Sequence, residues 1–320
     1  MAGRGLEGGR RSTRAAVALA LALAVLSACG LGPGRERSGG AELRVTRDFG
    51  RERLYAATRD RVREGDTVLR FLQSERRVET AYGGGFVQSI DGLAGAGSSG
   101  QRDWFYFVNG LEASVGAAER RLSEGDVVQW DLRRWEAAMS VPAIVGAYPE
   151  PLLSGIEGDR LPVRIECAED RGRACTEVER RLREAGVTAS VGRFGGLGGE
   201  NLLRVVVAPW PLARRVRAAS ALEKGPEASG VFARFGRGGR RLELLDATGR
   251  VARTAPPGTG LVAATAVEGQ QRVWLVTGGD EAGVERAAAS LDRATLRDRF
   301  AVAALPEGPE ALPLAEGGSP

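Results

Sequence analysis

The sequence predicts an α+β protein in which a strand-rich domain, residues 41–135, precedes an α/β domain, residues 161–305. Two observations predict this order. The first domain has two hairpin strands, one helix and then more strands, whereas the second alternates apolar strands with helices in βαβ-type units. The 320 residues suffice for two domains of ordinary size. A joint rich in Pro and Gly, residues 136–160, separates them, and the tail 306–320 is predicted to be disordered.

A lipoprotein signal is predicted at the N-terminus. Residues 1–28 hold several arginines and then the apolar run AAVALALALAVL, which is too short to span a bilayer with margin. The run leads into LSAC, which resembles a bacterial lipobox. The resemblance implies that the Cys29 thiol receives a diacylglycerol and that cleavage makes Cys29 the first residue of the mature protein. Residues 29–40 would then be a flexible tether; an ordinary signal peptide with a chance cysteine is the alternative.

The predicted anchor fixes both the compartment and the charge of the mature chain. We expect acyl chains, palmitate among them, to hold the protein on the extracytoplasmic side of the cell membrane. The formal charge of +4 includes four arginines and one glutamate in residues 1–28, so the remainder carries +1. This balance, without a basic and aromatic cluster, is not typical of a nucleic-acid-binding protein.

The first domain shows its elements in a recognisable order. Two strands are predicted in AELRVTRDFG and RERLYAATRD, and a helix capped by Asp66 or Thr67 in the next segment. A strand pair follows in residues 76–93. Residues 102–110, RDWFYFVNG, form an apolar strand that ends in an Asn-Gly turn, and VVQWDLR is the closing strand. This succession is that of a β-grasp fold.

The segment RDWFYFVNGLEASVGAAERRLSEGDVVQWDLR resembles the transcobalamin-like C-terminal domain, a family also catalogued as a domain of unknown function in bacterial surface lipoproteins. The matching positions are Trp104, Tyr106, Val108, Asn109, Gly110, Gly116, Ala117, Gly125, Asp126 and Trp130. The resemblance covers the first domain only and implies a sheet that covers one side of a bound corrinoid. In that family a helical barrel holds the other side, and this chain has none.

The strand Trp104–Val108 is apolar on both faces, whereas a strand with one wet face alternates apolar and polar residues. Phe105 and Phe107 are expected under the helix. Trp104 and Tyr106, whose tips are polar, are expected at a wet boundary. They make an aromatic platform for a small molecule, with Tyr82 and Asn109 as further candidate ligand-binding residues.

The closing strand alternates strictly. Val128, Trp130 and Leu132 are predicted to face the core, and Gln129, Asp131 and Arg133 to face water. The platform has an alternative explanation, in which the second domain or the glycine-rich bend around Tyr82 covers that face.

The second domain contains the two remaining cysteines, Cys167 and Cys175, between a predicted strand and a predicted helix. In an oxidising compartment we expect them to form a disulfide. A metal pair is the alternative, but the chain has no histidine and no further cysteine to complete a zinc site. Two tryptophans, Trp210 and Trp274, belong to the core or line a cleft.

The absence of histidine also bears on catalysis, because it removes the usual general base. No carboxylate pair stands out, so we predict no enzyme activity, no catalytic residues, no metal and no cofactor. The predicted function is that of a lipoprotein that binds a small molecule, a corrinoid or similar flat molecule, as an uptake accessory. The alternative is a surface adhesion or scaffold protein that docks another protein or a cell-wall glycan.

Overall fold

The computed structural model describes Met1 and residues 40–96, 100–169, 172–195, 201–266 and 272–315. Contacts divide the chain into residues 1–38 and one compact unit, residues 39–320. The predicted signal peptide and tether, with Cys29, therefore lie outside the described residues. No helix among the described residues is both long and apolar enough to cross a membrane.

The first domain is built on a five-stranded sheet in the order β2-β1-β8-β6-β7. Strands β1 and β8 are parallel, and the other neighbours are antiparallel. The strands are β1 (Ala41–Arg47), β2 (Glu52–Arg59), β6 (Arg102–Val108), β7 (Leu111–Glu112) and β8 (Val127–Arg134). The chain forms the hairpin β1–β2, then a helix, then the strands β6 and β8, and β8 lies beside β1. This arrangement confirms the predicted β-grasp order.

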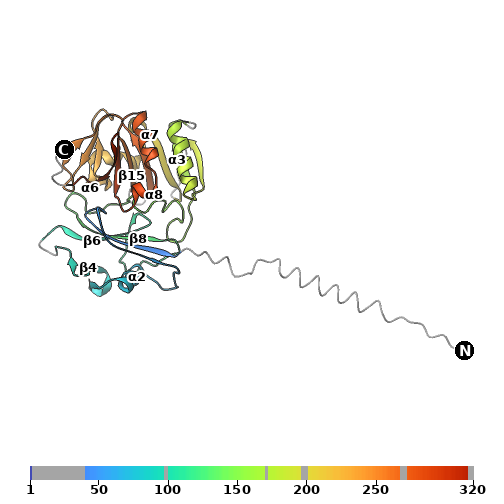
Figure 1. The fold of residues 1–320 in the computed structure, drawn as a ribbon, viewed down its shortest axis with the longest axis vertical. Helices are drawn as coiled ribbons and strands as arrows, with labels where there is room; N and C mark the ends of the chain where they lie inside the picture. The colour runs from blue at the N-terminus through green and yellow to red at the C-terminus, as the bar shows by residue number, and fades with distance from the viewer. Residues whose placement is uncertain (2–39, 97–99, 170–171, 196–200, 267–271, 316–320) are drawn as a thin grey trace. The chain divides into compact units, whose positions relative to one another are not determined.

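One face of this sheet is covered by the helix α2 (Val68–Glu75) and a small sheet (Figure 1). The helix begins where predicted, because the Thr67 hydroxyl accepts a hydrogen bond from the backbone N–H of Arg70. The small sheet consists of β3 (Val78–Ala81), β4 (Phe86–Ile90) and β5 (Leu93–Ala94), with the short helix η1 (Tyr82–Gly84) between the first two strands. Together they bury the apolar residues of β1 and β8.

The second domain contains a seven-stranded sheet in the order β10-β9-β11-β16-β15-β17-β18. Its strands are β9 (Val163–Cys167), β10 (Ala189–Arg193), β11 (Leu203–Pro209), β15 (Gly260–Ala266), β16 (Arg272–Gly278), β17 (Ala301–Leu305) and β18 (Gly308–Leu312). Two helices, α3 (Arg173–Glu184) and α7 (Glu281–Ala289), cover one face. The strands β10, β9, β11 and β16 are parallel, so β9, α3 and β10 form the βαβ unit that the sequence predicts.

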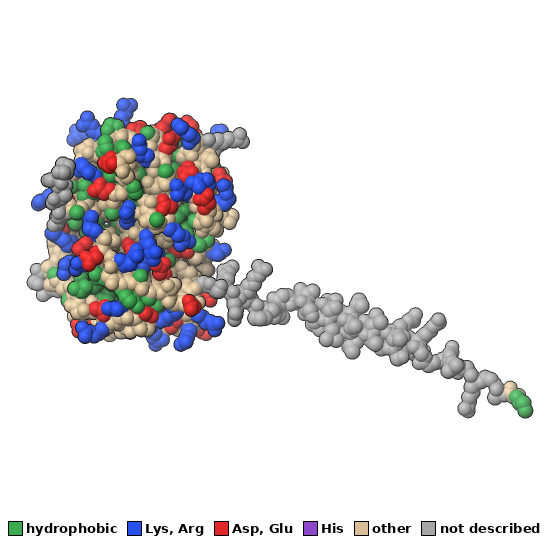
Figure 2. Space-filling view, in the orientation of Figure 1, with side chains coloured by type: hydrophobic (Ala, Val, Ile, Leu, Met, Phe, Trp, Pro, Cys, Tyr) green, Lys and Arg blue, Asp and Glu red, His purple; other side chains and the backbone are tan. Residues whose placement is uncertain are grey.

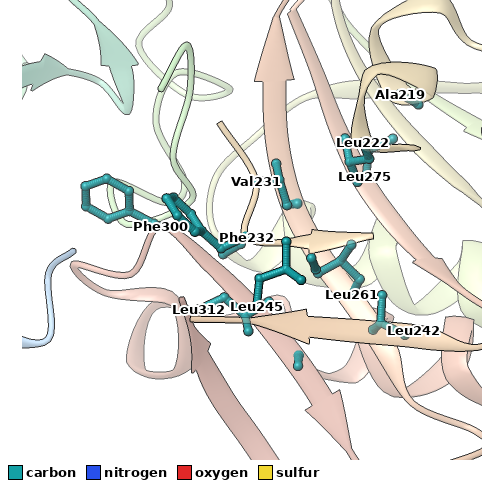
Figure 3. Packing of buried hydrophobic residues seen from close by; sticks show 14 of the residues in the cluster. Ala219, Leu222, Val231, Phe232, Leu242, Leu245, Leu261, Leu275, Phe300 and Leu312 are labelled. Carbon is teal, nitrogen blue, oxygen red and sulfur yellow. The ribbon is translucent and has the colours of Figure 1, made fainter. Parts of the chain in front are cut away.

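A second three-stranded sheet and several short helices cover the other face of the second domain. The sheet consists of β12 (Ala233–Phe235), β13 (Leu242–Leu245) and β14 (Val251–Thr254). The helices are α4 (Trp210–Ala213), α5 (Arg217–Ser220), η3 (Ala221–Lys224) and α6 (Pro226–Ser229). The short helix α8 (Arg293–Leu296) packs through Leu296 in the cluster of α3 and α7 instead. Figure 3 shows the packing of this core around Phe232, Leu245 and Leu275.

Two segments differ from the sequence predictions. The tail is not disordered over residues 306–315, because β18 pairs with β17 and Leu314 is buried. The joint, residues 136–160, has no described helix or strand, yet it is packed between the domains: Val141 and Ile144 belong to one apolar cluster, and Val145 to another. The first cluster also takes in side chains of the first domain, so the two domains share a core.

Candidate binding groove at the edge of the first sheet

The aromatic side chains of β6 lie on the opposite faces from those predicted. Trp104 and Tyr106 pack in the cluster under α2, and Tyr106 stacks on Trp130 with ring centroids 4.9 Å apart. Phe107 lies on the other face, where it meets Phe300 of the second domain edge-to-face at 5.4 Å. The expectation that the phenylalanines pack under the helix is therefore wrong. The second domain supplies the apolar surface that covers them.

The polar face of β8 is not wet, contrary to the prediction. Gln129, Asp131 and Arg133 are all buried. Asp131 accepts hydrogen bonds from the Thr46 hydroxyl at 2.6 Å and from the backbone N–H groups of Phe49 and Gly50. Burial raises the pKa of Asp131 to about 6, despite these donors.

Arg133 continues this buried network toward the outer edge of the sheet. Its guanidinium lies 3.8 Å from the centroid of the Phe105 ring and donates to the carbonyl oxygens of Ala138 and Met139. It also pairs with Glu112 at 3.3 Å. The chain that follows β8 is thereby held against the edge of the sheet.

A cavity of about 450 Å³ lies at this edge, and we call it the β6 groove. Its lining residues are Gly85, Phe86, Val87, Trp104, Phe105, Tyr106, Glu112, Ala113, Ser114, Val115, Gly116, Ala117, Trp130, Met139 and Ser140. Three consecutive β6 residues line it, although their side chains alternate between the two faces. A cavity that touches all three must reach round the edge of the strand.

The rim of the β6 groove exposes apolar side chains. Phe86 is 39% exposed, Val115 44% and Met139 59%. Figure 2 shows hydrophobic side chains gathered low on the molecule, where Figure 1 places β4 and β6. Large apolar side chains that surround a hollow are typical of a binding surface, whereas single exposed ones are ordinary.

Of the four predicted ligand-binding residues, two line the groove and two do not. Trp104 and Tyr106 line the groove, but Trp104 is only 5% exposed and its indole N–H donates to the Leu93 carbonyl oxygen at 3.0 Å. Tyr82, 90% exposed, is not among the lining residues. Asn109 is buried at the β6–β7 turn, where its amide donates to Asp126 and to the Gly155 carbonyl oxygen.

Two polar side chains of the groove, Tyr106 and Glu112, are already engaged, whereas the buried indole N–H of Trp130 has no hydrogen-bond partner among the described residues. The Tyr106 hydroxyl donates to the Val115 carbonyl oxygen at 2.5 Å, and burial raises the pKa of Tyr106 to about 12. Glu112 is the ionisable carboxylate among the lining residues, and it accepts from Arg133, the Ser140 hydroxyl and the Val141 N–H. The groove therefore presents a neutral, largely apolar surface to a ligand.

Three of the rim residues were missed by sequence reasoning. Phe86 follows the glycine-rich bend, and Val115 and Met139 lie in irregular segments that show no strand or helix periodicity. The available signal was the strand β6 itself, whose residues Trp104–Val108 are apolar on both faces. Its neighbours across the groove depend on how the chain packs after β7 and β8.

The predicted disulfide is confirmed: Cys167 and Cys175 are bonded, with their Cα atoms 5.8 Å apart. It joins the end of β9 to the first turn of α3, beside a second cavity of about 370 Å³. Arg173 and Glu285 form an ion pair of 2.9 Å in the lining of that cavity. Within the described part of the chain, no three His, Cys, Asp or Glu side chains gather as a metal site. Trp210 and Trp274, for which two roles were open, are both buried in the core.

Residues 65–134 match the family model described as Domain of unknown function (DUF4430). The match contains α2, β6, β8 and the lining of the β6 groove except for two residues after β8. No curated protein matches the chain. Among solved structures, the chain is similar to a Ruminococcus gnavus protein described as a "putative metal binding protein", at 17% identity and a TM-score of 0.25, over 30% of this chain and 98% of the other.

Proposed function

We propose that the protein is a membrane-anchored extracytoplasmic lipoprotein that binds a small, flat, largely apolar molecule in the β6 groove. The observation that carries the proposal is the hollow edge of the first sheet, with Phe86, Val115 and Met139 exposed around it. The groove is formed before any ligand enters, as small-molecule sites generally are. Its role is binding without catalysis, in keeping with a chain that has no histidine.

A corrinoid is the first ligand to test, because the first domain resembles the transcobalamin-like domain. The groove differs from an open aromatic platform, since Trp104 and Trp130 form its inner wall and the rim residues make the accessible contacts. A flat ring system would lie between the side chains of Phe86 and Met139. Uptake would follow from release of the ligand to a membrane transporter.

The test is a fluorescence titration of residues 40–320, which lie within one compact unit, with cobinamide. Trp104 and Trp130 line the groove, so binding should quench the emission in a saturable way after correction for absorbance by the corrinoid. Val115→Glu should weaken binding at least about tenfold, because it places a charge at the apolar rim. Trp104→Ala is a poor test, since this side chain is buried in the core.

Val251→Glu is the matched control. Val251 is 43% exposed on β14 of the second domain, against 44% for Val115, so it receives the same charge at similar exposure. Equal affinities for the two variants would contradict the proposed site.

The anchor is tested separately in the full chain. Cys29→Ser should abolish incorporation of labelled palmitate and move the protein out of the membrane fraction. Labelling that persists in this variant would contradict lipidation at Cys29.

The alternative function, docking of a surface protein or a cell-wall glycan, is favoured by one observation. Tyr82, the most exposed large hydrophobic residue among the described residues of the first domain, lies outside the groove on η1. Binding of cells or cell-wall fragments that is lost in Tyr82→Ser and kept in Val115→Glu would select this alternative.

A further inference from the structure

We infer that the β6 groove recognises its ligand through the backbone of β6, and that the ligand class is a short, extended, apolar peptide that adds to the sheet as a strand. The inference rests on the proposed function for the location of the site, the β6 groove, and it puts an extended peptide in place of a flat ring as the ligand class.

The direction of the β6 backbone groups follows from the β6–β7 hairpin. Val108 and Leu111 flank the two-residue turn Asn109–Gly110, so the N–H and C=O of Val108 face β7. Backbone groups alternate along a strand, so those of Tyr106, Trp104 and Arg102 face the same outer side.

Chain segments cover this outer edge at both ends of the strand. The Tyr106 carbonyl oxygen accepts from the N–H of Ala113 at 3.3 Å, and the Arg102 carbonyl oxygen accepts from the N–H of Ala96 at 2.7 Å. Between them, the N–H and C=O of Trp104 have no hydrogen-bond partner among the described residues. Trp104 lines the β6 groove. The N–H of Tyr106, on the same side, also has no partner among the described residues, so the edge of the sheet is open around Trp104 and the groove lies against it.

A donor and an acceptor from one strand residue are complemented by the C=O and N–H of one residue of an antiparallel strand. A peptide supplies this pair, with amide groups on both sides of a single Cα. Peptides that bind in this way obtain affinity from the backbone and specificity from alternate side chains.

The walls of the groove suit alternate apolar side chains. Phe86 and Val87 lie with Trp130 on the side of the sheet under α2, and Met139 lies beyond Phe105 on the opposite side. A strand placed against Trp104 would direct successive side chains toward these two walls. The carboxylate of Glu112 is engaged by Arg133, so the lining favours a neutral segment.

The test is N-methyl scanning of the capped, uncharged peptide acetyl-SVFVS-amide, measured by titration calorimetry with residues 40–320. An N-methyl group removes one donor and blocks one side of the added strand. Methylation at alternate positions, those that face β6, should weaken binding about tenfold, and methylation at the intervening positions should leave it unchanged. Val115→Glu should weaken the parent peptide, and Val251→Glu should not.

Four outcomes separate the inference from the proposed function. The alternating pattern supports strand addition. Peptide binding that is equally tolerant of every N-methyl group overturns it. Cobinamide binding that is sensitive to Val115→Glu, with no peptide binding, leaves the groove as a small-molecule site and overturns the inference alone. Self-association of the protein that is lost in Val115→Glu assigns the open edge to a second copy and also overturns it.

Discussion

The two faces of the five-stranded sheet are equally dry, but they are built from opposite chemistry. Under α2 the strand β8 contributes Val128, Trp130 and Leu132, and toward the second domain it contributes Gln129, Asp131 and Arg133. The first face is closed by apolar contact, whereas the second combines the apolar contacts of Phe49 and Phe107 with hydrogen bonds and ion pairs to the second domain. Alternation along a strand therefore shows that two faces differ, but does not show that the polar face meets water.

Asp298 is the centre of the polar contact between the domains. Its carboxylate accepts from Arg53 of β2 at 2.7 Å and pairs with Arg44 of β1 at 3.5 Å, and its carbonyl oxygen accepts from Gln129 at 2.8 Å. Arg44 also donates to the Gly146 carbonyl oxygen. Three strand residues of the first domain thus contact Asp298 of the second.

The largest effect is expected on the apolar face. Phe71 is fully buried under α2, so Phe71→Ala should lower the free energy of unfolding by about 3–5 kcal/mol through lost burial and a residual cavity. Urea unfolding would measure it. Gln73→Ala on the exposed side of the same helix should change stability by less than about 0.5 kcal/mol. Similar losses for both variants would show that the helix does not seal this face.

The polar face should instead respond to pH through Asp131. Its pKa is raised to about 6 in the folded protein, from an ordinary 3.8. The contribution of this carboxyl to the free energy of unfolding is fully present below pH 3.8 and is lost as pH rises through about 6. Relative to wild type, Asp131→Asn should therefore gain about 3 kcal/mol of stability between pH 4 and pH 7.

Urea unfolding at a series of pH values would measure this difference. Asp246→Asn is the contrasting control, because hydrogen bonds with Thr248 and Arg250 leave the pKa of Asp246 lowered and the slope should have the opposite sign. A difference between Asp131→Asn and wild type that is constant with pH would contradict the buried, ionised carboxylate.

A smaller effect is expected at Asp298, where the charge can be removed without a change in backbone preference. The residue has φ of 67°, which Asn tolerates well. Asp298→Asn leaves Arg53 without its carboxylate and should cost about 2 kcal/mol. Because the loss falls between the domains, fluorescence and circular dichroism should then give separate unfolding transitions. Coincident transitions at wild-type stability would show that the shared apolar core alone couples the domains.

The smallest effect belongs to the rim of the same contact. Arg297 pairs with Glu42 at 2.8 Å, and the arginine side chain is partly solvated. Arg297→Ala should cost less than about 1 kcal/mol at low salt and nothing measurable at 1 M salt. A large, salt-independent loss would place this pair inside the dry interface.

The sequence was informative wherever local chemistry decides the structure. The Thr67 cap and the disulfide both follow from residues close together in the chain. The β-grasp order followed from the succession of elements. The sequence did not predict what covers each face of the sheet. That depends on contacts between residues far apart in the chain, such as Phe49 with Phe232 and Phe107 with Phe300.

At the candidate site, too, the features set by local sequence were predicted and those set by distant contacts were not. The strand around Trp104 was predicted from its continuous apolar run, but its two faces were exchanged. The polar tips of Trp104 and Tyr106 suggested water, yet each tip finds a backbone carbonyl inside the fold. The rim depends on Met139, which Arg133 and Glu112 hold in place through a contact that has no local sequence signal.

The position of β1 would have a mechanical consequence if the proposed lipid anchor holds the protein by its N-terminal segment. The strand β1 lies between β2 and β8 and pairs with both along its length. A pull on the tether would run along the strand, so both ladders would bear the load at once and their hydrogen bonds would have to break together. An edge strand pulled in the same direction would load a single ladder, so the placement of β1 would spread the force over two ladders instead of one.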